Sequence, residues 1–191
     1  MHNHFVEDKT YDNIHFKDAG LQKAEYENCT FNTCDFSNTD LSNIKFTDCA
    51  FNHCNLSMAM LGNTTFKNIV FNSCKMLGLR FEHCSKMAFE IRADNSILNH
   101  CSFYQIKLKN AVFTSSQFEE ADFTEANLTG ILFKNCNLQK AVFENTVLEK
   151  ADFTTAYNYA LDPEMNRMKK AKFSLNGLGG LLQKYQFDIT N

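Results

Sequence analysis

Large apolar residues recur at every fifth position over most of this chain. In the first half they stand at Tyr11, Phe16, Leu21, Tyr26, Phe31, Phe36, Leu41, Phe46, Phe51, Leu56, Leu61, Phe66, Phe71, Met76 and Phe81. We call these residues centres. An α-helix repeats its apolar face every 3.6 residues and a strand every two, so neither element explains a period of five.

A smaller inward position precedes each centre by two residues. It holds Ala, Cys, Thr or Ile, as at Ala24, Cys49 and Ile69, and the other three positions are mostly polar. A unit this short cannot bury its own apolar side, so successive units must stack on one another. The phrase Phe-Asn-x-Cys begins at residues 31, 51 and 71, which adds a period of twenty. Together the two periods predict a four-sided coil whose Asn residues stack from coil to coil.

The five-residue period slips once. Centres resume at Leu98, Phe103, Leu108, Phe113, Phe118, Phe123, Leu128, Phe133, Leu138, Phe143, Leu148 and Phe153, in a register displaced by two residues. A net insertion of two therefore lies between Glu82 and Ser96, where we expect Met87, Phe89 and Ile91 to pack in a bulged turn. Irregular segments on rigid scaffolds often carry recognition. A tolerated bulge without a function is the alternative.

Several segments have the sequence of a known repeat. Ala121-Asp122-Phe123-Thr124-Glu125, Ala126-Asn127-Leu128-Thr129-Gly130 and Cys34-Asp35-Phe36-Ser37-Asn38 resemble the Ala-(Asp/Asn)-Leu-x-x unit of pentapeptide-repeat proteins. The resemblance covers about residues 11–157. It implies an all-β solenoid, a right-handed quadrilateral β-helix in which the centre and the smaller position both point inward.

The repeat divides the chain into three parts. Residues 1–10 form a polar lead-in that we expect to be poorly ordered, and residues 11–160 form the β-helix. Residues 161–191 are expected to form a C-terminal cap of helix and strand.

The expected cap contains two helices. Asp162-Pro163 is typical of a helix start and predicts a helix to about Lys170. Asn176 is the expected cap of a second helix, residues 177–185, before a strand over residues 186–190.

Because an open coil end exposes apolar side chains, this tail must close its own rod or pair with another copy. The resemblance to the quinolone-resistance branch of the family favours a homodimer joined at the C-termini. The candidate interface residues are Leu178, Leu181, Leu182 and Tyr185.

Composition restricts the classes of partner. The formal net charge is −3 in 191 residues, so no strong attraction to nucleic acid or to an anionic membrane is expected. No apolar run approaches the roughly 20 residues that cross a bilayer. The polar N-terminus lacks the apolar core of a signal peptide, which makes a cytoplasmic location the expectation.

Metal, cofactor and catalytic chemistry are not expected. Seven of the eight Cys fall two residues before a centre, and Cys84 falls two before Lys86, where the unbroken period would place one, so all eight are expected to act as small apolar side chains. In His53-Cys54, His83-Cys84 and His100-Cys101 the His points outward and the Cys inward, so the two cannot share an ion. No phosphate-binding loop, nucleophile elbow or zinc-protease motif occurs. We therefore predict a protein that is not an enzyme and holds no cofactor.

The candidate partner surface combines an acidic group with the irregular turn. Glu119, Glu120, Asp122 and Glu125 cluster outside two adjacent faces, and Lys86 and Arg92 lie in the irregular segment. We predict contact with an unidentified protein partner. The family resemblance also implies an alternative, a DNA mimic that binds DNA gyrase or topoisomerase IV and protects them from quinolones. A mimic needs a regular acidic stripe, yet twenty residues further on stand Gln139, Lys140, Val142 and Asn145.

Overall fold

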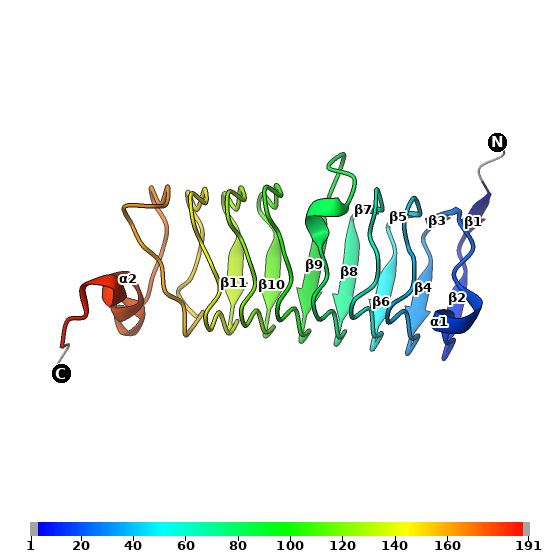
Figure 1. Cartoon of the computed structure of the whole chain (residues 1–191), viewed down its shortest axis with the longest axis horizontal. Helices are drawn as coiled ribbons and strands as arrows, with labels where there is room; N and C mark the ends of the chain where they lie inside the picture. Colours follow the sequence, from blue (N-terminus) through cyan, green and yellow to red (C-terminus); the bar gives the residue numbers. More distant parts are fainter. Residues whose placement is uncertain (1–3, 189–191) are drawn as a thin grey trace.

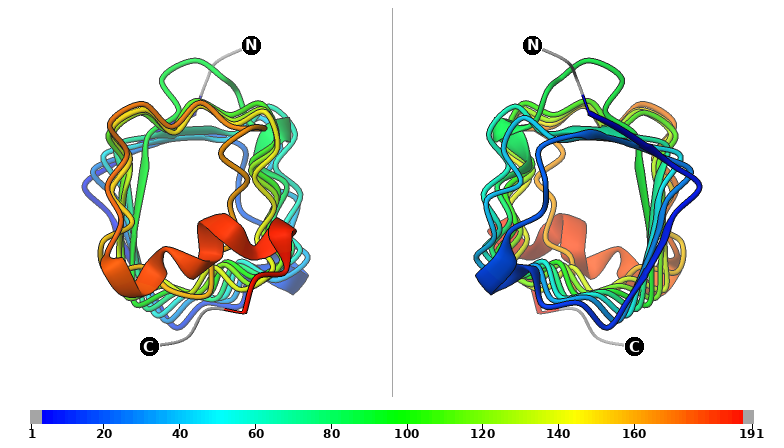
Figure 2. Two further views of the ribbon diagram at one scale, coloured as in Figure 1. Left: turned by 90° about the vertical axis from the view of Figure 1, so that its left-hand side faces the viewer. Right: turned by 90° about the vertical axis from the view of Figure 1, so that its right-hand side faces the viewer.

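The chain folds into a straight rod of stacked four-sided coils (Figure 1), which a computed structural model describes for residues 4–188. The rod is the expected right-handed quadrilateral β-helix, and its square cross-section is plain when it is viewed along the axis (Figure 2). All strand pairs are parallel. One sheet contains β1 (Phe5–Glu7), β3 (Glu25–Glu27), β5 (Lys45–Thr47) and β7 (Thr65–Lys67). A second sheet contains β2 (Thr10–Asp12), β4 (Thr30–Asn32), β6 (Ala50–Asn52), β8 (Ile69–Asn72), β9 (Ile91–Asp94), β10 (Val112–Thr114) and β11 (Leu132–Lys134).

The centres stack directly above one another. Phe31 pairs with Phe51 and Phe51 with Phe71, which confirms the twenty-residue coil. The Phe31 and Phe51 rings are parallel to within 12°, with 4.8 Å between their centroids. These rings are fully buried and form the axis of the core. The remaining faces are joined by single bridges such as Asp35 with Asn55.

Polar side chains at the smaller inward position bond to the coil that precedes them. The Cys49 Sγ donates to the Tyr26 carbonyl oxygen over 3.4 Å, and the Thr64 hydroxyl donates to the Leu41 carbonyl oxygen over 2.8 Å. All eight Cys are free and buried, as expected. Burial raises the pKa of the Cys49 thiol to about 12. The Cys49 thiol is therefore protonated and serves the scaffold.

The Asn residues of the repeated phrase form the expected ladder. The Asn52 amide donates to Asn32 and the Asn72 amide donates to Asn52, each over 2.8 Å. Asn32 in turn donates to the Asp12 carboxylate over 2.8 Å. Asn32 and Asn52 each donate one of these bonds and accept another, which links the corners of successive coils.

The turn between faces requires a left-handed residue two positions after most centres. Asn38 and Asn63 fill this position with φ of 56°, which Asn tolerates better than most residues. Longer side chains also occupy it, among them Lys150 with φ of 59°. Such residues cost conformational energy because the left-handed region crowds their Cβ atom.

Replacing Lys150 by Asn should therefore stabilise the rod. We expect Lys150→Asn to raise the free energy of unfolding by roughly 0.5–1 kcal/mol, because Asn enters this conformation more readily. Urea denaturation followed by circular dichroism measures the change. The same substitution at Lys134, an exposed residue in β11 outside these left-handed positions, should not stabilise. Equal effects at the two positions would refute the explanation.

The rod begins earlier than the sequence predicted. Residues 1–10 were expected to be a poorly ordered lead-in, yet β1 pairs with β3 along Phe5–Glu7. Val6 is buried, five residues before Tyr11, so it is the first centre within the described residues. A single apolar residue in a polar segment did not reveal the repeat. Residues 1–3 lie outside the described part of the chain. The short helix α1 (Phe16–Ala19) forms one corner of this first coil.

The predicted helix after Asp162-Pro163 is wrong, and so is the end of the β-helix at residue 160. Asp162 instead starts a turn, in which its carboxylate accepts from the Glu164 amide over 2.9 Å. The next residues form another coil, with Arg167 bridged to Val147 and Lys172 to Asp152. Stacking on the coil beneath satisfies the backbone, and this outweighs the local helix signal.

The C-terminal tail folds back over the last coil. It comprises the 3-10 turn η2 (Leu175–Gly177), the helix α2 (Gly179–Leu182) and the 3-10 turn η3 (Gln183–Tyr185). The helix predicted over residues 177–185 is thus present only in part, as the four-residue helix α2 and the turn η3. Asn176 does not cap α2, which begins after Leu178 without a side-chain cap, whereas the Ser174 Oγ accepts from the Gly177 amide and caps η2. Residues 186–188 are not a strand, and residues 189 and 190 lie outside the described part. No helix within residues 4–188 is long and apolar enough to cross a bilayer.

The tail closes its own rod. The Leu161 amide donates to the Gly180 carbonyl oxygen over 2.9 Å, and Leu181 packs against the core. Lys184 binds the carboxylates of Asp162 and Glu164 over 2.7 and 2.6 Å. Of the two roles left open by the sequence, the structure shows the intramolecular cap.

Candidate interaction surface

The irregular coil lies where the sequence placed it. Ile69 pairs with Ile91 and Phe71 with Ala93, an offset of 22 residues, whereas Phe113 pairs with Ala93 at the usual offset of 20. The 3-10 turn η1 (Phe81–His83) precedes the extra residues. In Figures 1 and 2 the segment after it projects beyond the outline of all other coils. We call residues 84–90 the projecting loop.

The three apolar residues of this segment behave differently from one another. Met87 is 80% exposed at the projecting loop, so the expectation that it packs in the turn is wrong. Phe89 turns inward and meets the Phe81 ring edge-on, with 5.8 Å between centroids. Ile91 is buried at the smaller inward position, two residues before Ala93, the small centre of this face.

Two small cavities flank Phe89. One has a volume of about 100 Å³ and is lined by Lys86, Phe89, Gln105, Ile106 and Lys107; we call it the Phe89 cavity. The other, of about 50 Å³, lies toward Arg92 and Lys109. The projecting loop thus stands away from the rod far enough to leave space beneath it.

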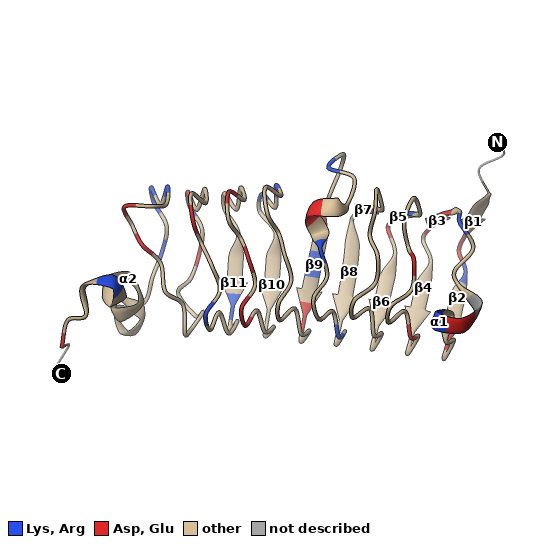
Figure 3. Cartoon of the chain, in the orientation of Figure 1, with Lys and Arg blue, Asp and Glu red and all other residues tan. Residues whose placement is uncertain are grey.

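The predicted acidic residues are together but are not an uninterrupted stripe. Glu120 lies 3.2 Å from the Lys140 Nζ and 3.3 Å from the His100 Nδ1. The Lys140 ammonium holds the pKa of Glu120 below its usual range. Glu125 accepts a hydrogen bond of 2.8 Å from Gln105. Figure 3 shows acidic and basic segments mixed along the rod.

The two remaining acidic residues take part in hydrogen bonds of the rod itself. The Asp122 carboxylate accepts from the Thr124 amide over 2.8 Å, which stabilises a turn, and the Glu119 amide donates to Asn99 on the coil below. Of the predicted basic residues, Lys86 lines the Phe89 cavity, whereas Arg92 lies in β9, 3.8 Å from the Glu90 carboxylate. Gln105 links the Phe89 cavity to the group of acidic residues, because it lines the cavity and donates a hydrogen bond to Glu125.

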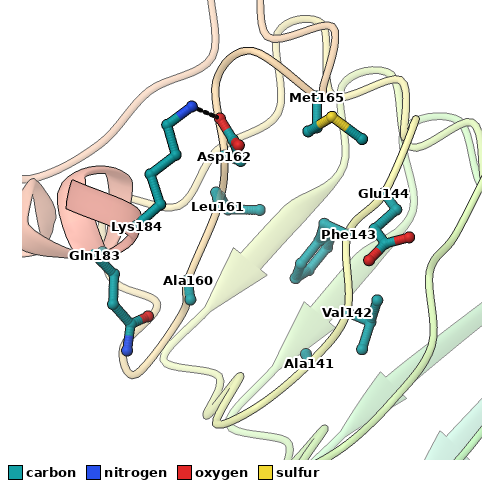
Figure 4. Close-up of a pocket in the computed structure, with 11 residues that line it drawn as sticks. Ala141, Val142, Phe143, Glu144, Ala160, Leu161, Asp162, Met165, Gln183 and Lys184 are labelled. Carbon is teal, nitrogen blue, oxygen red and sulfur yellow. Dashed lines mark hydrogen bonds and ion pairs between the residues drawn. The ribbon is translucent and has the colours of Figure 1, made fainter. Parts of the chain in front are cut away.

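Another hollow with apolar walls lies beside the C-terminal cap (Figure 4). It measures about 420 Å³ and includes Phe143, Glu144, Leu161, Asp162 and Lys184. The hydrogen bond with Lys184 lowers the pKa of Asp162, so this carboxyl stays ionised. General acid catalysis needs a raised pKa, which Asp162 lacks. Among residues 4–188 no group of three or more His, Cys, Asp or Glu could hold a metal ion.

Stacked five-residue faces with inward Phe, Leu and Cys define a β-solenoid scaffold. Two family descriptions match the sequence, pentapeptide repeats over residues 14–52 and a pentapeptide repeat region over residues 93–161. The chain belongs to the pentapeptide-repeat family. A comparison with curated protein sequences found no match.

Solved structures of the same fold include QnrB1, a plasmid-mediated fluoroquinolone resistance protein. Its trypsin-treated form matches with a TM-score of 0.63 and 19% identity, over 97% of this chain and 100% of that one. Its full-length form matches with a TM-score of 0.55 and 19% identity, over 96% and 100%. HetL from Nostoc sp. strain PCC 7120, a pentapeptide-repeat protein involved in heterocyst differentiation regulation, gives a TM-score of 0.28 at 13% identity over 92% and 88%. At these identities the QnrB1 matches show a shared fold.

Proposed function

We propose that this chain is a cytoplasmic, non-catalytic scaffold that binds a protein partner through the irregular coil, residues 82–96. The observation that carries the proposal is the projecting loop with Met87 exposed at 80%. The two extra residues are not needed to build this face of the coil. The preceding coil builds the equivalent face with only five residues, Thr65-Phe66-Lys67-Asn68-Ile69. The insertion therefore adds nothing to the stability of the solenoid. An exposed methionine adapts readily to a protein surface.

Site-specific photo-crosslinking tests this proposal. The chain carries p-benzoylphenylalanine in place of Met87 and is irradiated in cells that produce it at native levels. We expect one protein adduct of defined mass, identified by mass spectrometry. The control carries the same group in place of Lys134, which is exposed on β11. Equal adducts from both positions, or none from Met87, would refute binding through the projecting loop.

Gyrase binding is the second candidate, favoured by the fold match to QnrB1 over nearly the whole chain. The acidic residues do not support charge mimicry of DNA, because Glu120 is paired with Lys140. A supercoiling assay with DNA gyrase or topoisomerase IV, with and without ciprofloxacin, tests this candidate. Protection at micromolar protein would support it, and neither inhibition nor protection would refute it.

We also propose a homodimer through the outer face of the cap. Leu178 is 42% exposed and Tyr185 45% exposed, and Leu182 lies between them on α2. Of the four predicted interface residues, Leu181 faces its own core and is not available to a second copy. An apolar face exposed at the end of a rod favours self-association.

Light scattering after size exclusion measures this association. We expect twice the 21.9 kDa mass of the chain for the native protein. The double variant Leu178→Glu with Leu182→Glu should be monomeric, because two carboxylates would then face each other in the twofold contact. Gln183→Glu adds a charge on the exposed turn η3 and should leave the mass unchanged. A native monomer, or a dimer of the double variant, would contradict this interface.

A further inference from the structure

The surroundings of Phe89 are positively charged on a chain whose net charge is −3. Lys86 and Lys107 line the Phe89 cavity, and Arg92 and Lys109 line the smaller cavity beside it. The one carboxylate among these lining residues is Glu90. Four bases against one acid give a local charge of +3.

The lysines of the cavity are not neutralised within the described chain. Several exposed lysines of this chain reach carboxylates, as Lys45 does with Glu25 and Lys140 with Glu120. Within residues 4–188, neither Lys86 nor Lys107 has a carboxylate within ion-pair distance. The nearby acids are occupied: Glu90 faces Arg92, and Glu82 faces Arg80 at 3.5 Å. The cavity therefore attracts negative charge.

The floor of the cavity is apolar. Phe89 is only partly buried and presents its ring to the space of about 100 Å³, which Ile106 borders on the side of the core, so the inner wall is hydrocarbon. This volume matches a side chain of the size of leucine. Gln105, the remaining lining residue, is committed to Glu125 on the next coil. A ligand must then combine one aliphatic group with carboxylates on either side.

We infer that the Phe89 cavity is the docking site for an acidic segment of the partner protein, a leucine-sized side chain flanked by Asp or Glu. The aliphatic group enters between Phe89 and Ile106, and the flanking carboxylates meet Lys86 and Lys107. Exposed Met87 extends the apolar contact. This inference rests on the proposed function, because it specifies the chemistry of the segment that the projecting loop recognises.

Fluorescence anisotropy with short labelled peptides tests this chemistry on the full-length protein. The probe contains Asp-Leu-Asp, and its two counterparts contain Asn-Leu-Asn and Asp-Gly-Asp. We expect binding of the first, weakened about tenfold in each counterpart, because a single exposed ion pair contributes about threefold and the leucine about tenfold. Raising salt from 50 to 500 mM should also weaken binding. No binding at millimolar peptide, or equal binding of Asn-Leu-Asn, would overturn the inference.

Lysine variants locate the site. Lys86→Gln and Lys107→Gln should each weaken the Asp-Leu-Asp peptide about threefold, whereas Lys134→Gln, the same change on β11, should not. Both cavity lysines are exposed, so the variants should fold normally. Vesicles containing phosphatidylserine serve as a competing probe. If they bind with the same lysine dependence and the peptide does not, the occupant is a membrane and the inference fails.

The crosslinking experiment separates the two claims. Adducts from position 87 that persist undiminished in the Lys86→Gln, Lys107→Gln chain would leave the protein-binding function standing and overturn the acidic partner. Loss of the adduct in this chain, with retention in Lys134→Gln, would support both.

Discussion

Phe51→Ala should lower the free energy of unfolding by roughly 3–5 kcal/mol, because removing this large buried side chain leaves a cavity in the core. Phe51 is 0% exposed and is stacked between Phe31 at 4.8 Å and Phe71 at 5.2 Å. Its edges meet Phe46 and Phe36 on neighbouring faces. Because each coil of a solenoid is held only by its neighbours, a cavity here weakens two interfaces at once.

Urea denaturation followed by circular dichroism gives this number, and a matched control isolates the effect of stacking. Phe5 carries the same ring at the edge of the first coil and is 52% exposed. Phe5→Ala should change the free energy of unfolding by less than about 1 kcal/mol. If both variants lost the same amount, the axial stack would not be the core of the protein.

Asn166→Ala should cost roughly 2–4 kcal/mol although it removes no apolar surface. Asn166 is 8% exposed and its side chain holds three backbone groups. It accepts from the Thr146 amide over 2.9 Å and donates to the carbonyl oxygens of Phe143 and Asp162 over 2.8 and 3.0 Å. The Thr146 amide and the Phe143 carbonyl oxygen would each lose this partner in a buried position, which costs about 1–3 kcal/mol apiece before relaxation, whereas the Asp162 carbonyl oxygen keeps its bond from the Met165 amide.

A shorter side chain with a hydroxyl should restore part of this stability. Thr146 occupies the equivalent position one coil earlier and donates to the Phe123 carbonyl oxygen over 2.9 Å. Asn166→Thr should therefore recover the hydrogen bond to the Phe143 carbonyl oxygen. Its melting temperature should be higher than that of Asn166→Ala. Asn176→Ala, on the exposed turn η2, should have little effect. An Asn166→Ala melt that coincides with the native one would show that water replaces the side chain.

The five-residue period predicted the rod because every centre is a large apolar residue that must be buried inside the coil. The twenty-residue register, the inward Cys and the Asn ladder all followed from spacing alone. Spacing failed where a coil has atypical residues. Val6 is a lone apolar residue in a polar segment, and Asn166 and Met168 occupy inward positions that more often hold small apolar residues and Phe. There the Asp162-Pro163 signal suggested a helix, but stacking on an existing coil overrode it.

The candidate site was predicted only as a segment. The two-residue offset located the irregular coil, and Lys86 was named from it. The sequence could not show that Phe89 turns inward, that Met87 turns outward, or that Ile106 and Lys107 complete a cavity from the next coil. Those facts depend on how the loop leaves the rod. The sequence nevertheless contained a sign of the positive charge at this site. Lys107 and Lys109 flank the centre Leu108, and neither Ile106 nor Asn110 beside them is acidic.

The claim that the irregular coil serves recognition and not stability can be tested by making it regular. Residues 86–90, Lys-Met-Ala-Phe-Glu, are replaced by Phe-Lys-Asn, copied from residues 66–68. This change deletes two residues and returns the offset between Phe71 and Ala93 from 22 to 20. It also removes the left-handed conformation of Ala88.

The decisive measurement is the yield of crosslinked partner in this regular-coil chain. Both it and the native chain carry p-benzoylphenylalanine in place of Tyr104, an exposed aromatic residue next to Gln105. We predict that the regular-coil chain melts at the same temperature or higher and that its partner adduct is lost. An undiminished adduct, or a rod that unfolds without its loop, would contradict the proposed role of the irregular coil.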